Sequence, residues 1–516
     1  MAVLALFLSS RLQRCRVGHI RYSVDGCDLG FVVCRLFRYH CAHMSDTKIK
    51  ARFAPSPTGR VHLGNLRTAL FNALFARRHD GVFLLRIEDT DEERSRKEFV
   101  NDLEEDLLWL GLNWQEGPGH DGGHAPYFQS ERTPVYQKYY ELLEQQGLAY
   151  FCFCSEAELN MSRRRQLAAG QPPRYPGTCA RLSREDALAR IAEGKLPTLR
   201  FRVPRAQVVQ FEDSVRGTQQ FATEDIGDFI IRRANGTSAF FFCNAIDDAL
   251  MGVSHVLRGE DHLANTPRQI LILKALNLPV PQYGHISMIV GADGAPLSKR
   301  HGSRSIRELR ESGYLPTAVV NYLARLGHHF ESNELLDLNG LAAKFELERL
   351  GRSPARFDPE QLLHWQKESI ARADNDAVWA WMDATAQQIV PADRRAEFLD
   401  AVKPNLVLPP DALRWARIAF ETVLEHSESA RAVIVATRPD FFANALAAVE
   451  DKLTDFKSVA AVIKGSTGAK GKALFEPLRA ALTGEVDGPE MGRLLPVIGV
   501  ERALARLRTA QEMAIG

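Results

Sequence analysis

The stretch that most constrains this chain runs from Arg52 to Asp91, RFAPSPTGRVHLGNLRTALFNALFARRHDGVFLLRIEDTD. The segment KIKARFA, which begins at Lys48 and overlaps the start of this stretch, predicts a short strand ending at Ala54. Two prolines then prevent a helix. From Leu63, leucines recur at steps of three and four, which predicts a helix. GVFLLRIED, Gly81 to Asp89, predicts a second, buried strand. This order forms a βαβ unit, the start of a doubly wound sheet.

The loop of this unit carries a candidate ligand site. Ligands of such sheets bind at the carboxyl ends of the strands. His62, Gly64 and Asn65 come at the N-terminus of the predicted helix, where free N–H groups and the helix dipole favour phosphate. The glycine spacing matches neither the dinucleotide-binding fingerprint nor a P-loop. The alternative is an ordinary helix N-terminus with an incidental histidine.

Composition narrows the class of protein. The chain has 516 residues, of which 45% are hydrophobic and 25% charged, so we expect a globular protein of several domains. The net charge of +1 means that a nucleic-acid partner would need local basic patches. No apolar run has the length of a membrane span, and eight scattered cysteines indicate a reducing compartment. We therefore expect no membrane role.

Residues 1–43 differ from the rest, with six arginines, no lysine and two acids. A secretory signal is disfavoured because no basic residue precedes the apolar run. An organellar transit peptide is a second hypothesis, and a start of translation at Met44 is the third. We favour the third and expect this N-terminal extension to be disordered or not translated. The expected location is cytoplasmic, or mitochondrial if the extension is a transit peptide.

The first motif resembles that of a known family. APSPTGRVHLGNLRTAL is similar to the HIGH-type signature of class I aminoacyl-tRNA synthetases, in the form found in bacterial-type glutamyl-tRNA synthetases, and RIEDTDEERS matches the same family. The resemblance implies that His62 and Gly64 contact ATP. It also implies that Arg52, Ser56 and Glu88 hold glutamate. An arginine can bind a carboxylate through two hydrogen bonds, and a glutamate can receive the substrate's ammonium group.

A second segment, Phe240 to Leu276, resembles the other half of the same catalytic domain. There the resemblance assigns Asn244 and Arg258 to glutamate binding and Asp261 to ATP binding. HVLRG predicts a strand that carries Arg258 to its carboxyl end. The alternative for this arginine is an ion pair with Glu260 or Asp261.

A third segment, GAPLSKRHGS, resembles the KMSKS loop. The resemblance implies that Ser298 and Lys299 bind ATP, and that Lys299 acts with His62 in catalysis by neutralising charge on the phosphates. Two positions depart from the family, because Phe240 replaces a tyrosine and Pro296 replaces the first lysine of the loop. These departures keep open a non-discriminating or tRNA(Gln)-charging enzyme. A catalytically inactive tRNA-binding module is the alternative from another class.

The insertion between the two halves carries a candidate metal site. Its C-x-C pair is followed after 24 residues by a third cysteine, which suits zinc. The family's usual fourth ligand is replaced by Arg181, whereas Tyr175 fits the spacing of another family variant. The candidate ligands of one structural Zn²⁺ are Cys152, Cys154, Tyr175 and Cys179. The alternative is a buried thiol cluster that has lost its metal.

The last third, from about residue 335, has a largely helical pattern. Thr467 to Leu507 resembles the anticodon-binding end of bacterial-type glutamyl-tRNA synthetases. Lys470, Lys472 and Arg479 could contact phosphates there.

Together these patterns predict an α/β multidomain protein, with a class I Rossmann-like catalytic domain, an inserted acceptor-stem-binding domain and a mostly α-helical anticodon-binding region. The expected ranges are 44–131 and 240–292 for the catalytic halves, 132–239 for the insertion, 293–370 for the KMSKS-type loop and stem-contact domain, and 371–516 for the anticodon-binding region. The resemblance implies a monomer that uses ATP with Mg²⁺ to convert L-glutamate to glutamyl-adenylate. The glutamyl group then passes to the 3′ end of tRNA(Glu).

Overall fold

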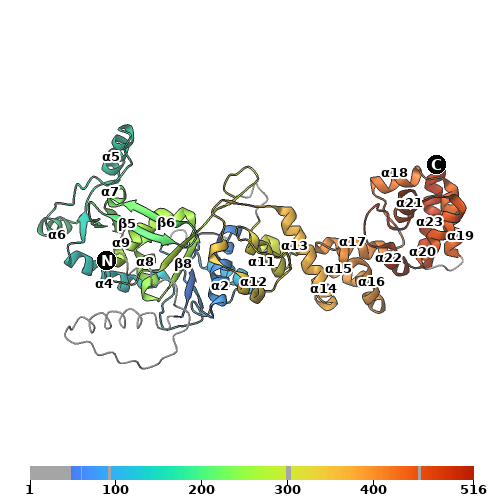
Figure 1. Ribbon diagram of the computed structural model, residues 1–516, viewed down its shortest axis with the longest axis horizontal. Coiled ribbons are helices and arrows are strands. Elements are labelled where there is room, and N and C mark those ends of the chain that lie inside the picture. Colours follow the sequence, from blue (N-terminus) through green and yellow to red (C-terminus); the bar gives the residue numbers. More distant parts are fainter. Residues whose placement is uncertain (1–47, 60, 91–94, 298–303, 451–454) are drawn as a thin grey trace, which may run out of the picture. The chain divides into compact units, whose positions relative to one another are not determined.

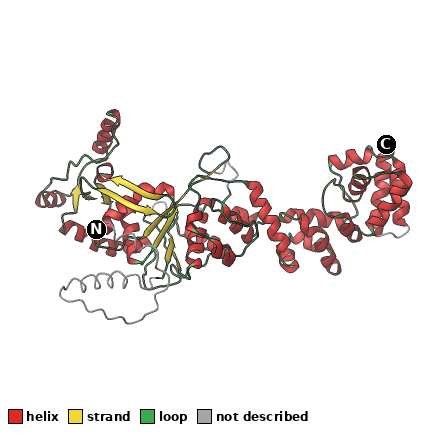
Figure 2. Ribbon diagram, viewed as in Figure 1, coloured by secondary structure: helices red, strands yellow, loops and turns green. Residues whose placement is uncertain are grey.

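A computed structural model describes residues 48–516 except 60, 91–94, 298–303 and 451–454. The predicted extension, residues 1–43, and the candidates Ser298 and Lys299 lie outside the described residues. Figure 1 labels the elements, and Figure 2 separates helices from strands.

The centre of the catalytic portion is a six-stranded sheet with the order β2-β1-β8-β9-β5-β6. Its strands are β1 (Lys50–Phe53), β2 (Val82–Leu85), β5 (Val208–Asp213), β6 (Gly217–Ala222), β8 (His255–Gly259) and β9 (Gln282–Ile286). All neighbouring strands are parallel except β5 and β6, which form an antiparallel hairpin. The parallel strands therefore place their carboxyl ends along one edge of the sheet.

The predicted βαβ unit is present. Helix α2 (Leu63–Arg78) joins β1 to β2, and the leucines that predicted it are buried against the sheet: Leu63, Leu66, Leu70 and Leu74. Strand β2 is shorter than predicted, because β1 ends at Phe53, which pairs with Leu85. Beyond Leu85, Arg86 and Glu88 still donate to the carbonyls of Phe53 and Pro55, and Ile87 donates to the carbonyl of Tyr127.

The predicted insertion, 132–239, holds two kinds of structure. One is a small antiparallel sheet in the order β3-β4-β7, made of β3 (Ala149–Cys152), β4 (Thr198–Phe201) and β7 (Phe229–Arg232). Its helices are α4 (Thr133–Gln145), α5 (Glu156–Ala168), α6 (Arg184–Ala192) and α7 (Thr223–Ile226). The other is the β5–β6 hairpin, which extends the catalytic sheet by pairing with β9. Part of this range therefore belongs to the central sheet.

Four more elements belong to this part of the chain: α3 (Lys97–Trp109), α8 (Phe240–Leu250), α9 (Thr266–Ala275) and β10 (Ile289–Val290). β10 pairs with β11 (Ala355–Arg356), so the chain after residue 350 returns to the catalytic portion. One hydrophobic core joins α2 and the sheet to residues as far as Trp365, and a separate core begins at Ile370.

Apart from β11, the described residues from 335 onward form helices and loops, as the sequence predicts (Figure 2). The helices after the sheet are α10 (Ile306–Glu311), α11 (Pro316–Arg325), α12 (Leu338–Lys344), α13 (Pro359–Arg372), α14 (Asn375–Trp381), α15 (Ala384–Ile389), α16 (Arg395–Val402), α17 (Pro409–Phe420), α18 (Glu428–Val435), α19 (Pro439–Glu450), α20 (Phe456–Thr467), α21 (Lys472–Thr483), α22 (Met491–Ile498) and α23 (Val500–Ile515). Within the described ranges, no single helix is long and apolar enough to cross a membrane, although α18 and α19, bent by 99°, meet the length and composition together.

Candidate active site

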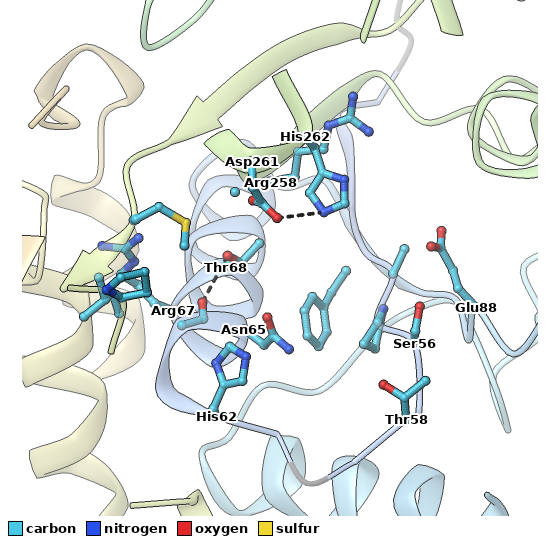
Figure 3. A pocket seen from close by; sticks show the side chains of 18 of the residues that line it. Ser56, Thr58, His62, Asn65, Arg67, Thr68, Glu88, Arg258, Asp261 and His262 are labelled. Carbon is cyan, nitrogen blue, oxygen red and sulfur yellow. Dashed lines mark hydrogen bonds and ion pairs between the residues drawn. The ribbon is translucent and has the colours of Figure 1, made fainter. Parts of the chain in front are cut away.

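A cavity of about 510 Å³ lies where the parallel strands end and α2 begins. Figure 3 shows Ser56, His62, Glu88 and Asp261 around it, carried by the β1–α2 connection, the chain after β2 and the chain after β8. The sequence-predicted residues that line it are Arg52, Ser56, His62, Gly64, Glu88, Asn244, Arg258 and Asp261. Pro296 and Leu297, which precede the predicted Ser298 and Lys299, line it as well. The fold thus gathers all the described candidates for glutamate and ATP binding in one cavity.

His62 stands at the N-cap of α2, whose first turn holds no acidic residue. Burial lowers the pKa of His62, so its imidazole is neutral and can donate one hydrogen bond. A side chain at Gly64 would place its Cβ only 3.2 Å from His62 Nδ1. Glycine therefore leaves room for the ring over the start of the helix, where N–H groups favour phosphate.

Arg52 and Glu88 are not free in the cavity wall, because buried partners hold both. Arg52 donates to both carboxylate oxygens of Asp248 at 3.3 Å. Glu88 accepts from Arg86 at 3.0 Å and from Asn244 Nδ2 at 2.5 Å. Burial alone would raise the pKa of Asp248, but Arg52 and Arg86 hold it below its ordinary value. Arg86 contacts both Glu88 and Asp248, so this one arginine links the two acids that hold the site together.

Asn244 is oriented by this network. Its Nδ2 donates to Glu88, and its Oδ1 accepts from Gln269 Nε2 at 2.7 Å. The two contacts fix which way the amide points. Burial raises the pKa of Glu88, although the positive charges of Arg86 and Arg52 act to lower it.

Arg258 differs from Arg52, whose buried partner in the cavity wall is an acid. It is 5% exposed, and none of its ion-pair or hydrogen-bond partners among the described residues is an acid. Its Nη1 has no hydrogen-bond partner within the described part of the chain. The sequence also allowed an ion pair between Arg258 and Glu260. This prediction is wrong, because Glu260 instead contacts Arg216 and the backbone N–H of Met288. Burial lowers the pKa of Arg258 to about 10, so it remains a cation at neutral pH.

The two departures from the family both lie on the cavity. Phe240 lines it, with its ring centroid 5.2 Å from that of His262, and Pro296 lines it from the loop after β10. Burial and the charge of Arg258 lower the pKa of His262 to about 4, so this ring is neutral as well.

Sequence reasoning missed several residues that build the site. Arg86 and Asp248 hold Glu88 and Arg52, as described above. Arg67 lines the cavity and donates to the carbonyls of Leu326 and Ser287, which ties α2 to two later segments. The sequence contained one indication of the role of Arg86. Alternate residues of an extended chain lie on the same face, and Arg86 is two residues before Glu88, so the two side chains are expected to be neighbours.

The candidate zinc ligands are brought together in the insertion. The three thiol sulfurs lie within 4.8 Å of one another, and Cys154 Sγ is 3.7 Å from Cys179 Sγ. Tyr175 Oη is 3.3 Å from Cys152 Sγ and 3.5 Å from Cys154 Sγ. Arg200 stacks on the Tyr175 ring, 3.8 Å from its centroid. The Tyr175 hydroxyl therefore lies in contact with the thiol cluster.

Comparisons with known proteins show which family this chain resembles. A model of the catalytic domain of class I tRNA synthetases (E and Q) matches residues 48–364, and an anticodon binding domain model matches residues 362–511. Glutamate–tRNA ligase 2 of Nitrosococcus oceani is 61% identical over 471 residues, which cover 91% of this chain and 100% of that protein. Glutamate–tRNA ligase 1 of Methylococcus capsulatus is 57% identical over 459 residues, covering 89% of this chain and 98% of that protein.

The same likeness extends to solved structures. The crystal structure of a glutamate tRNA ligase from Elizabethkingia meningosepticum in complex with its amino acid superposes with a TM-score of 0.79 at 27% identity, covering 90% of this chain and 99% of that one. The catalytic model alone spans more than half of the chain. The chain therefore belongs to the class I tRNA synthetases of the glutamate and glutamine (E and Q) family, and its high-identity relatives are glutamate–tRNA ligases.

Proposed function

We propose that this chain is a glutamate–tRNA ligase that activates L-glutamate with ATP and Mg²⁺ and transfers it to the 3′ end of tRNA(Glu). The observation that carries the proposal is Arg258, a buried cation without an acidic partner among the described residues. A buried charge is costly unless a counter-charge meets it. The side-chain carboxylate of glutamate supplies that charge, whereas the neutral amide of glutamine does not.

The remaining cavity residues suit the other end of the amino acid. Glu88 offers a carboxylate to the substrate's ammonium group, and Arg52 and Asn244 are fixed beside it by Asp248 and Gln269. This leaves the α-carboxylate of glutamate to face the ATP site. Holding the reacting groups in one geometry is the main contribution such a cavity can make to the rate.

In the proposed first step, an α-carboxylate oxygen of glutamate forms a bond to the α-phosphorus of ATP. The bond between the α-phosphorus and the oxygen that bridges to the β-phosphate breaks, and pyrophosphate leaves. Mg²⁺, when bound, would offset the negative charge of the phosphates. The neutral His62 and the N–H groups at the start of α2 donate to the phosphates, and Lys299 adds positive charge there. In the second step, a terminal ribose hydroxyl of the tRNA attacks the carbonyl carbon and AMP leaves.

A charging assay tests the function. The purified full-length chain is incubated with ATP, Mg²⁺, radiolabelled glutamate and separate transcripts of tRNA(Glu) and tRNA(Gln), and glutamine is the control amino acid. We expect glutamate to be attached to tRNA(Glu) and glutamine to neither transcript. Failure to charge either tRNA, while a control synthetase charges its own, would contradict the proposal and favour a binding module.

Charging of tRNA(Gln) with glutamate is the second candidate function. It is favoured by the two cavity positions that depart from the family, Phe240 and Pro296. The same assay decides, because this candidate requires glutamate on the tRNA(Gln) transcript.

We also propose that Cys152, Cys154, Tyr175 and Cys179 hold one structural Zn²⁺. In a tetrahedral site, sulfurs about 2.3 Å from zinc lie about 3.8 Å apart, and an oxygen at about 2.0 Å lies about 3.5 Å from each sulfur. The observed separations of 3.7 Å between sulfurs and of 3.3 and 3.5 Å between the phenol oxygen and sulfurs fit these values. Bound zinc would link the end of β3, where Cys152 lies, to the segment that contains Cys179.

Metal analysis of the purified chain tests the zinc proposal. We expect about one zinc per chain, as in closed structural sites, and a weaker retention against a chelator in Tyr175→Phe. Tyr139→Phe, outside the cluster, is the matched control. A chain without zinc after purification in metal-containing buffer would contradict the proposal.

A further inference from the structure

Arg258 is held by a row of buried polar side chains. Its Nε donates to His285 Nε2 at 3.3 Å. Its Nη2 donates to Thr266 Oγ1 at 2.8 Å and to Gln269 Oε1 at 2.6 Å. His285, Thr266 and Gln269 are completely buried. All three acceptors are uncharged groups, so they orient the guanidinium without neutralising it.

His285 is held in turn by Asp213, the last residue of β5. The ring nitrogen Nδ1 lies 2.5 Å from Asp213 Oδ2, and the backbone N–H of His285 donates to Oδ1 at 3.2 Å. The same carboxylate accepts from the backbone N–H groups of Val215 and Arg216 at 3.0 and 2.8 Å. Asp213 is therefore fixed from several sides and can act as an anchor.

These contacts determine where the proton of His285 sits. A guanidinium has donors only, so Nε2 of His285 must be the unprotonated, accepting nitrogen. The ring proton is therefore on Nδ1, where it faces the carboxylate of Asp213. The hydroxyl of Thr266, 3.0 Å from the same Nε2, can direct its proton there as well. Burial lowers the pKa of His285, which keeps the ring neutral beside Arg258.

We infer that Asp213 and His285 are positioning residues for the recognition of glutamate. Asp213 selects the tautomer in which His285 accepts from Arg258, and this contact leaves the unpaired Nη1 of Arg258 for the substrate's carboxylate. An acid in direct contact with Arg258 would compete with the substrate. A neutral ring with an acid behind it fixes the geometry and leaves the charge available. The inference rests on the proposed function.

The anchor comes from an unexpected part of the chain. Asp213 lies within residues 132–239, which the sequence assigns to an insertion that binds the tRNA acceptor stem, but β5 pairs with β9 next to His285. The orientation of the glutamate-binding arginine thus depends on a side chain outside both predicted catalytic halves.

Two substitutions of His285 separate the two contacts of the ring. In His285→Asn, the short amide can still donate to Asp213 from the position of Nδ1 but offers no acceptor near Arg258. In His285→Gln, the longer amide can place its oxygen at the position of Nε2 and accept from Arg258. Each variant is compared with the wild-type chain for kcat and for the KM values of glutamate and ATP, using a tRNA transcript that the wild type charges.

We expect His285→Asn to raise the KM for glutamate about tenfold or more, the loss of one hydrogen bond to a charged group. The KM for ATP should change less than about twofold, and His285→Gln should stay closer to the wild type. Equal effects of the two variants, or equal changes in both KM values, would overturn the inference because a merely structural role predicts them. Thermal unfolding of each variant shows whether it is folded.

A second pair keeps the inference testable if the His285 variants do not fold. Thr266→Val removes the hydroxyl that contacts both Arg258 and His285, and Thr266→Ser keeps it. We expect a higher KM for glutamate in the valine variant alone, and equal KM values in the two would overturn the inference. If the wild-type chain itself does not attach glutamate to tRNA, the proposed function fails first. If the wild-type chain attaches glutamate to tRNA but the two variants of each pair have equal KM values for glutamate, only the positioning role fails.

Discussion

Arg86 joins Glu88 to Asp248, with its Nη2 3.0 Å from Glu88 Oε1 and its Nη1 2.7 Å from Asp248 Oδ1. All three side chains are buried. Because Asp248 also accepts from Arg52, one arginine that sequence reasoning passed over supports two predicted glutamate-binding residues. Its neighbours hold its pKa above the ordinary range despite burial, so it stays charged.

Replacement of this arginine should destabilise the catalytic portion strongly. Arg86→Met would remove a buried cation from two buried carboxylates, Glu88 and Asp248, and breaking a buried pair in this way costs about 3–5 kcal/mol. Thermal unfolding followed by circular dichroism should show a clear fall in the midpoint of the catalytic transition. Arg438→Ala is the matched control, because its ion pair with Asp440 is exposed and worth about 1 kcal/mol or less. Equal midpoints for the two variants would refute the structural role of Arg86.

Gly64 should matter for activity and not for folding. Gly64→Ala would place a Cβ 3.2 Å from His62 Nδ1 and force the ring to move, although alanine favours a helix over glycine. We expect adenylate formation to slow about ten- to a hundredfold, as small misplacements in active sites can do, without a lower unfolding midpoint. Gly59→Ala is the control, because no atom of another described residue outside its chain neighbours lies within 4 Å of the added Cβ. Similar rates in the two variants would count against the placement of His62.

His328 should make the chain less stable in acid. Its ring stacks on Phe345 at 4.8 Å, and burial lowers its pKa from 6.5 to about 4. Above pH 6.5 the folded and unfolded forms are both neutral at this ring, so it contributes nothing to pH dependence. Between pH 6.5 and 4 the unfolded chain binds the proton first, and stability therefore falls as the pH is lowered.

The comparison of His328→Phe with the wild type isolates this effect. Phenylalanine keeps a ring in the stack but cannot titrate, and any lost contact with Glu346 lowers stability equally at every pH. The difference in unfolding midpoint between pH 7 and pH 5 should therefore be smaller in the variant. An unchanged difference would show that His328 is not the buried neutral group described above.

Local patterns predicted much of the site, because its first elements are adjacent in the sequence. The leucine spacing after Leu63 defined α2, and HVLRG defined β8, so the positions of His62 and Arg258 at the sheet's edge followed from general rules. The family resemblance supplied the expected roles. These roles remain predictions, including those of Ser298 and Lys299, which lie outside the described residues.

The supporting contacts could not be read from the sequence, because they join residues far apart in the chain. Arg86 meets Asp248 across 162 positions, and Asp213 meets His285 across 72. No local period marks such pairs. The first joins the chain after β2 to α8, and the second depends on the pairing of β5 with β9. The pairing of β5 with β9 also explains why a range predicted as an insertion contributes to the catalytic sheet.

The measurement that tests the central claim most directly is the selectivity of Arg258 variants for glutamate. In aminoacylation of the tRNA that the wild type charges, Arg258→Met should lower kcat/KM for glutamate about a hundredfold or more, because a charged contact is lost at a buried site. The KM for ATP should be nearly unchanged, and Arg258→Lys, which keeps a charge, should lose less. A methionine variant that retains wild-type kcat/KM for glutamate would contradict the account.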